Sequence, residues 1–160
     1  MKCVIVTGSP GTGKSKVARL IAEKLKGEYV DVNRLVKNKK IKSKYDKKLM
    51  TSIIDVKALN KYLIRMIKES KKLLVIDSHL SQYLPKKYVK LCVVTKCDLK
   101  ILKKRLEKRG YSKEKIRENL DAEIFDVCLV EAKEAGHKIN IVDTTKGMIN
   151  KRNLFKIIKV

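Results

Sequence analysis

The sequence predicts an α/β protein with one five-stranded parallel sheet flanked by helices. Short apolar runs alternate with longer segments whose apolar residues recur at helical spacing, a pattern typical of parallel strands joined by crossover helices. The chain has 160 residues, of which 44% are hydrophobic, so it is long enough for one sizeable core. No linker-like tract divides it, and we expect a single domain over residues 1–160.

The first strand is expected at residues 3–6, an apolar run with the length of a buried strand. Residues 14–26 follow with apolar side chains along one helical face, and Gly27 ends this periodic segment. Residues 29–32 then predict a second short strand. The next stretch, residues 33–48, is polar and rich in lysine, which indicates a small mobile insertion that covers a substrate.

Asp55 can cap a helix that ends near Ser70, because the apolar residues between them keep helical spacing. Residues 73–76 form a continuous apolar run closed by Asp77, as expected of a buried central strand. Residues 88–95 predict the next strand.

Asp98 can cap the following helix, which ends at Gly110, and Ser112 begins a long helix that we expect to continue to Gly136. The remaining elements are a fifth strand at 138–142, a loop at 144–147 and a last helix at 154–158.

A phosphate-binding loop is the strongest motif of the chain. Residues 8–15, GSPGTGKS, fit G-x-x-x-x-G-K-[ST] at every fixed position. The strand before and the helix after are the context that the motif requires, which disfavours a chance glycine-rich turn. Backbone N–H groups at this helix N-terminus would bind phosphate oxygens. Lys14 should reach the β- and γ-phosphates and the Ser15 hydroxyl should bind Mg²⁺, so the motif predicts a P-loop NTPase.

Two further polar residues lie near the expected cleft. Asp77 ends a buried strand beside the phosphate loop, where its carboxylate would hold Mg²⁺ directly or through water; the alternative is a cap for the next turn. His79 lies two residues on, and it is either a catalytic group or a structural histidine.

Arg105 and Arg109 are four residues apart, so the spacing predicts that they share one helix face. Aimed at the cleft, the pair could neutralise charge on a transferring phosphoryl group; a solvated basic face is the alternative. Residues 95–98, TKCD, match the guanine-reading motif of GTPases. No D-x-x-G follows the strand that ends at Asp77, so we interpret TKCD as a helix cap.

The charge of the chain is extreme, with a formal net charge of +23. This suits either a surface adapted to RNA or another polyanion, or a source organism with lysine-rich proteins. No apolar run reaches the length of a membrane span, so we expect no membrane association and a cytoplasmic protein. The four cysteines lack metal-like spacing and are expected to be reduced and mostly buried.

The chain resembles the adenylate kinase family, in particular its short-lid isoenzyme 6 type from archaea and eukaryotic nuclei. The resemblance is carried by GSPGTGKS at 8–15, VIDSH at 75–79, RLEKRGY at 105–111 and ENLDAEIF at 118–125. It implies a nucleoside monophosphate-binding insertion at about 31–54 and a short lid at about 108–118. It also implies ATP-dependent phosphorylation of AMP or related monophosphates, with an ATPase side reaction.

Carried over by position, the resemblance assigns several residues to ATP. Arg109 would approach ATP from the lid, Asp77 and His79 would form the catalytic pair, and adenine would lie near Lys146. The residues that would cradle ATP are Gly11, Gly13, Lys14, Ser15 and Lys16.

One departure from the main adenylate kinases concerns the monophosphate. Those enzymes carry G-F-P-R after the third strand, whose arginine holds the AMP phosphate, whereas residues 78–81 here are SHLS. AMP binding could therefore be weak, which would favour ATP hydrolysis. Arg34 or Lys37 could hold the second phosphate instead, although both also suit a solvated basic helix.

Members of the isoenzyme 6 group are associated with maturation of the small ribosomal subunit, where they bind a small-subunit ribosomal protein near the rRNA. An assembly factor switched by ATP is therefore the alternative function. A shikimate-type small-molecule kinase is disfavoured, because residues 31–33, DVN, lack the second carboxylate of its D-x-D motif.

Overall fold

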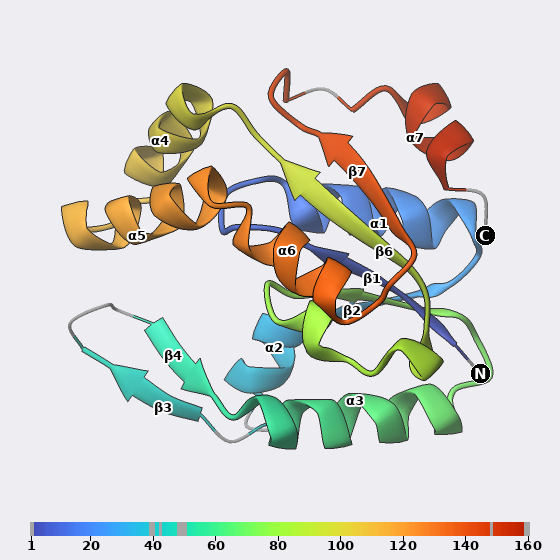
Figure 1. Ribbon diagram of the computed structural model, residues 1–160. Helices are drawn as coiled ribbons and strands as arrows, with labels where there is room; N and C mark the ends of the chain where they lie inside the picture. Colours follow the sequence, from blue (N-terminus) through green and yellow to red (C-terminus); the bar gives the residue numbers. More distant parts are fainter. Residues whose placement is uncertain (1, 39–40, 42, 48–50, 148, 159–160) are drawn as a thin grey trace.

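A computed structural model describes residues 2–38, 41, 43–47, 51–147 and 149–158. Its centre is a five-stranded sheet in which all neighbouring strands are parallel, which confirms the predicted fold class (Figure 1). In spatial order the strands are β2 (Glu28–Asp31), β5 (Leu74–Asp77), β1 (Cys3–Thr7), β6 (Val89–Lys96) and β7 (Ile139–Asp143).

Helices cover both faces of this sheet, and each face has its own core. Successive side chains of a strand point to opposite faces, so Ile5 of β1 packs in one core and its neighbour Val6 in the other. The Ile5 core includes residues of α3 (Val56–Glu69) and α6 (Val127–Glu134). The Val6 core includes residues of α1 (Lys14–Lys24) and α7 (Lys151–Ile157).

The sheet register brings the carboxyl ends of the central strands together. Val6 of β1 pairs with Asp77 of β5, and Asp31 of β2 pairs with the same residue from the other side. The phosphate loop follows β1 directly. Asp77 therefore lies beside this loop, as the sequence predicts.

The insertion after β2 has more structure than its polar sequence indicates. It contains α2 (Val32–Lys37) and an antiparallel hairpin of β3 (Ser43–Asp46) and β4 (Thr51–Ile54). Figure 1 shows the hairpin extending from the end of α3, on the side of the molecule that carries α5 (Lys113–Ile124). The predicted mobility concerns in part residues 39–40, 42 and 48, which lie outside the described residues.

The long helix expected over 112–136 is broken into α5 and α6. The break lies at Asp126, whose φ of 52° is in the left-handed region, where few residues other than glycine are found. The preceding α4 (Leu99–Lys108) ends in a turn at Gly110, with φ of 71°. Two short 3-10 helices, η1 (Ser81–Tyr83) and η2 (Lys86–Tyr88), complete the chain between β5 and β6.

Candidate active site

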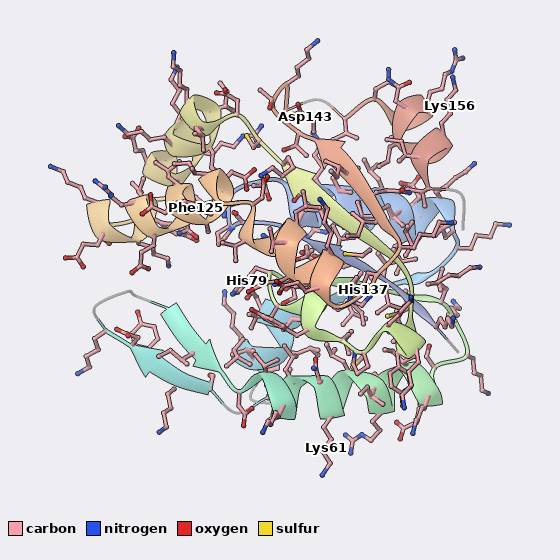
Figure 2. The ribbon with its side chains drawn as sticks, in the orientation of Figure 1. Lys61, His79, Phe125, His137, Asp143 and Lys156 are labelled. Carbon is pink, nitrogen blue, oxygen red and sulfur yellow. The ribbon has the colours of Figure 1, made fainter. Side chains whose placement is uncertain are left out.

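A cavity of about 680 Å³ lies at the carboxyl end of the sheet. Its walls come from the phosphate loop, the start of α1, the end of β5, the segment after β5, and helices α5 and α6. Figure 2 shows His79 near the centre of the molecule, and this residue belongs to the segment that follows β5. Among the residues expected at the site, the cavity is lined by Gly11, Gly13, Lys14, Ser15, Lys16, Asp77, His79 and Arg109.

The glycines of the phosphate loop adopt backbone conformations that do not tolerate a side chain. Gly8 has φ of 145°, and a Cβ there would lie 2.4 Å from Thr95 Oγ1. Gly13 caps α1 with φ of 83° and contributes no side-chain hydrogen bond. The first N–H groups of α1 are thus left without a side-chain cap, which is the arrangement that binds phosphate.

Lys14 is half-buried and lines this cavity, and its ammonium donates to the carbonyl of Ser9 at 3.1 Å. Burial lowers the pKa of Lys14, while the nearby Asp77 carboxylate opposes the shift. A partly desolvated ammonium gains more from an incoming phosphate oxygen than a fully solvated one would.

Asp77 and Ser15 supply oxygen ligands of the kind that Mg²⁺ prefers. The Asp77 carboxylate is 5% exposed, and its Oδ2 accepts a hydrogen bond from the Tyr29 hydroxyl at 2.8 Å. The described residues contain no cluster of three or more His, Cys, Asp or Glu side chains able to hold a metal. This donor set fits a magnesium ion whose remaining ligands are nucleotide phosphates and water.

His79 is a neutral imidazole near pH 7. Burial lowers its pKa to about 4, and the Lys14 charge adds to that shift. A neutral ring can accept or donate one hydrogen bond at each nitrogen. The geometry therefore allows His79 to orient a group in the cavity, and its catalytic role stays a prediction.

The two arginine side chains have different surroundings. Arg109 lines the cavity, whereas Arg105 lies outside the residues that line it. The Arg105 guanidinium donates to the carbonyls of Gly11 at 3.3 Å, Thr144 at 2.6 Å and Thr145 at 3.4 Å. Arg105 thus connects the phosphate loop to the loop after β7. This placement favours a structural role for Arg105 over direct contact with a phosphoryl group.

Lys146 belongs to the loop expected to hold adenine, and it is exposed outside the cavity. The same loop is tied to α1, because Lys16 Nζ donates to the Gly147 carbonyl at 2.9 Å. Contact of Lys146 with a base stays a prediction.

The TKCD segment is a helix cap, as interpreted from the sequence. Asp98 Oδ1 accepts from the backbone N–H groups of Lys100 at 2.9 Å and Ile101 at 3.2 Å, at the start of α4. Lys96 is bound to Glu123 at 2.9 Å and to Asp126, so it is committed to an ion-pair network.

The sequence analysis did not predict two sets of contacts at this site, those of Tyr29 and those of Glu131. Tyr29, which bonds Asp77, belongs to a strand whose pattern indicates only burial. Glu131 of α6 lines the cavity and accepts from the Tyr83 hydroxyl at 2.5 Å and from Gln82 Nε2 at 2.8 Å. No motif marks these residues, because their partners are far apart in the sequence.

The cysteines are free, and Cys3, Cys92 and Cys97 are buried, as expected. Burial raises the pKa of the Cys3 and Cys92 thiols to about 12. No helix in the described part of the chain has the length and apolarity of a transmembrane segment.

Comparison with solved structures supports the fold described above. Shikimate kinase from Acinetobacter baumannii, solved with shikimate, superposes with a TM-score of 0.64 at 15% identity, covering 99% of this chain and 92% of that one. An AAA domain family matches residues 4–126. Fold and phosphate loop together define a P-loop NTPase.

Curated relatives narrow this class. A Methanocaldococcus jannaschii protein named "Putative adenylate kinase" is 37% identical over 142 residues, which are 89% of this chain and 76% of the relative. The adenylate kinase isoenzyme 6 homolog of Dictyostelium discoideum is 35% identical over 133 residues, 82% of this chain and 74% of the relative. The chain belongs to the adenylate kinase family, isoenzyme 6 type, and is an adenylate kinase-like nucleotide kinase.

Proposed function

We propose that the protein is a Mg²⁺-dependent nucleoside monophosphate kinase that transfers the γ-phosphoryl group of ATP to AMP. The observation that most supports this proposal is that the phosphate loop, Asp77 and Arg109 line one cavity. Its volume of about 680 Å³ lies within the range of ligand pockets. The names of the curated relatives support AMP as the acceptor.

Each charged group has a part in this proposal. Lys14 and the loop N–H groups bind the β- and γ-phosphates, and Arg109 stabilises charge that develops on the transferring group. Ser15 and Asp77 would hold Mg²⁺, which when bound neutralises phosphate charge. The protein has little covalent chemistry to perform, so positioning and electrostatics supply the rate.

The fate of the phosphoryl group depends on the acceptor half of the cavity. Residues 78–81 lack the arginine that holds AMP in the main adenylate kinases. Asn33 of α2 and the segment after β5 contribute to the wall instead. We therefore propose that ATP is hydrolysed slowly when AMP is absent and water reaches the γ-phosphate.

A second candidate function is that of an ATP-switched factor in small ribosomal subunit maturation. The net charge of +23 supports it, since a strongly basic protein is attracted to RNA. Its partners would be a small-subunit ribosomal protein and rRNA. Retention of a ribosomal protein that ATP releases would support this function, and absence of any such complex would contradict it.

The experiment that tests the kinase is ADP production from ATP and Mg²⁺ by the purified protein, with and without AMP. A Lys14→Met variant is the control for contaminating kinases. We expect a large AMP-dependent rate that the variant lacks while keeping its circular dichroism spectrum. Equal rates for the variant and the parent protein would refute the assignment of Lys14.

A further inference from the structure

Glu123 is a carboxylate buried on α5, with only 5% of its surface exposed. Its Oε2 accepts a hydrogen bond from Ser9 Oγ at 2.9 Å. Its Oε1 lies 2.9 Å from the Lys96 ammonium and accepts from the Cys97 N–H at 3.1 Å. One side chain thus connects α5 with the end of β6 and with the phosphate loop.

Ser9 is the residue through which this contact reaches the functional groups of the loop. Its carbonyl accepts from the Lys14 ammonium at 3.1 Å. The same carbonyl accepts from the N–H of Thr12 at 3.2 Å and from its hydroxyl at 2.7 Å. The position of Ser9 therefore affects both the turn of the loop and the place where the Lys14 ammonium rests.

The other end of the network lies at the junction of α5 and α6. Lys96 binds the Asp126 carboxylate and the Glu123 carbonyl, and Asp126 is the residue with positive φ that separates the two helices. Both helices line the nucleotide cavity. The crevice between this junction and the loop has no room for a water molecule, so Ser9 contacts Glu123 directly and not through water.

A carboxylate is a costly choice for this position. Burying a charge is unfavourable unless it is paired and hydrogen-bonded, and an apolar residue would continue the buried face of α5 without that cost. The carboxylate can, however, accept from Ser9, Lys96 and Cys97 at once, which no apolar side chain can do.

We infer that Glu123 is a positioning residue for ATP binding. Through Ser9 it holds the phosphate loop in place relative to α5 and α6, which form the opposite wall of the cavity. The inference rests on the proposed function only in that this cavity binds ATP.

The test is the affinity for AMPPNP with Mg²⁺, measured by calorimetry. Ser9→Ala removes the hydrogen bond between the phosphate loop and Glu123. Glu123 stays bound to Lys96 and Cys97, so the fold is retained. We expect the dissociation constant to rise about tenfold, because one hydrogen bond to a charged group is worth about that factor. Glu123→Leu should weaken binding at least as much.

The double variant Ser9→Ala/Glu123→Leu separates positioning from general destabilisation. If the two residues act through one contact, the Ser9 change should have no effect once the carboxylate is absent. Ile67→Ala, a core change on α3, is the control for stability alone, and it should lower the melting temperature and leave AMPPNP affinity unchanged.

Wild-type affinity in Ser9→Ala, or additive effects in the double variant, would overturn the inference. Failure of the parent protein to phosphorylate AMP would refute the proposed kinase but would not affect this binding experiment.

Discussion

Replacing Arg105 and Arg109 separately with methionine distinguishes two accounts of these residues. Arg105 makes one short charged hydrogen bond, to the Thr144 carbonyl at 2.6 Å, and longer ones to Gly11 and Thr145. A hydrogen bond to a charged group contributes about 1.5–3 kcal/mol. We therefore expect Arg105→Met to lower the free energy of unfolding by about 2–3 kcal/mol, counting the longer bonds as weak.

The effects on kcat should have the opposite order, with the larger loss in Arg109→Met. Arg109 is exposed at the rim of the cavity, so Arg109→Met should change stability by less than about 0.5 kcal/mol. Its kcat should fall about 100-fold or more, as expected when a charge that stabilises the transition state is lost. Arg105→Met should raise the KM for ATP and leave kcat within about threefold, because it disturbs binding loops and not the reacting group.

Urea unfolding and steady-state kinetics at saturating ATP and AMP measure these effects. An Arg105→Met variant with unchanged stability and a kcat as low as that of Arg109→Met would refute this reasoning. It would show that Arg105 reaches the phosphoryl group, as its spacing from Arg109 predicts.

Three further changes test single contacts. Tyr29→Phe removes the donor to Asp77, and the Mg²⁺ concentration for half-maximal turnover should rise about fivefold, equivalent to ~1 kcal/mol; an unchanged value would contradict this role. Burial and the bond to Glu131 raise the pKa of Tyr83 to about 12 from a usual value of 10.0. The folded state then holds a proton that the unfolded state loses, so stability should fall as pH rises from 10 toward 12. In a phenolate absorbance titration, Tyr83→Phe should lack one late-ionising tyrosine, and loss of one that ionises near pH 10 would contradict the shift. Asp98→Ala removes the cap of α4 and should cost about 1 kcal/mol in urea unfolding, with Asp98→Asn close to the parent protein; equal losses in both would argue against capping.

The sheet and the phosphate loop could be predicted because their signals are local. Residues 3–6 and 73–76 are continuous apolar runs, which buried parallel strands require. The loop follows from a motif in which each fixed residue has a steric or chemical reason. Asp77 was predictable for the same cause, since the carboxyl ends of parallel strands lie at one edge of the sheet.

The rest depends on contacts between distant residues. Arg105 and Arg109 have helical spacing, and the Arg109 N–H donates to the Arg105 carbonyl at 3.2 Å. Only Arg109 lines the cavity, because the Arg105 guanidinium is bound to the loop after β7. The break after α5 arises where Glu123 and Asp126 bind Lys96 of another element. Neither contact leaves a trace in the local pattern, and the apolar residues on both sides of residue 126 favour one continuous helix.

The destination of the γ-phosphoryl group tests the central claim most directly. ATP carrying a radioactive γ-phosphate is incubated with the protein, Mg²⁺ and AMP, and the products are separated by chromatography. Transfer predicts that the label appears in ADP, with two ADP formed for each ATP consumed, and that Lys14→Met abolishes it. Label found only in inorganic phosphate, at a rate that AMP does not change, would contradict the kinase and identify an ATPase.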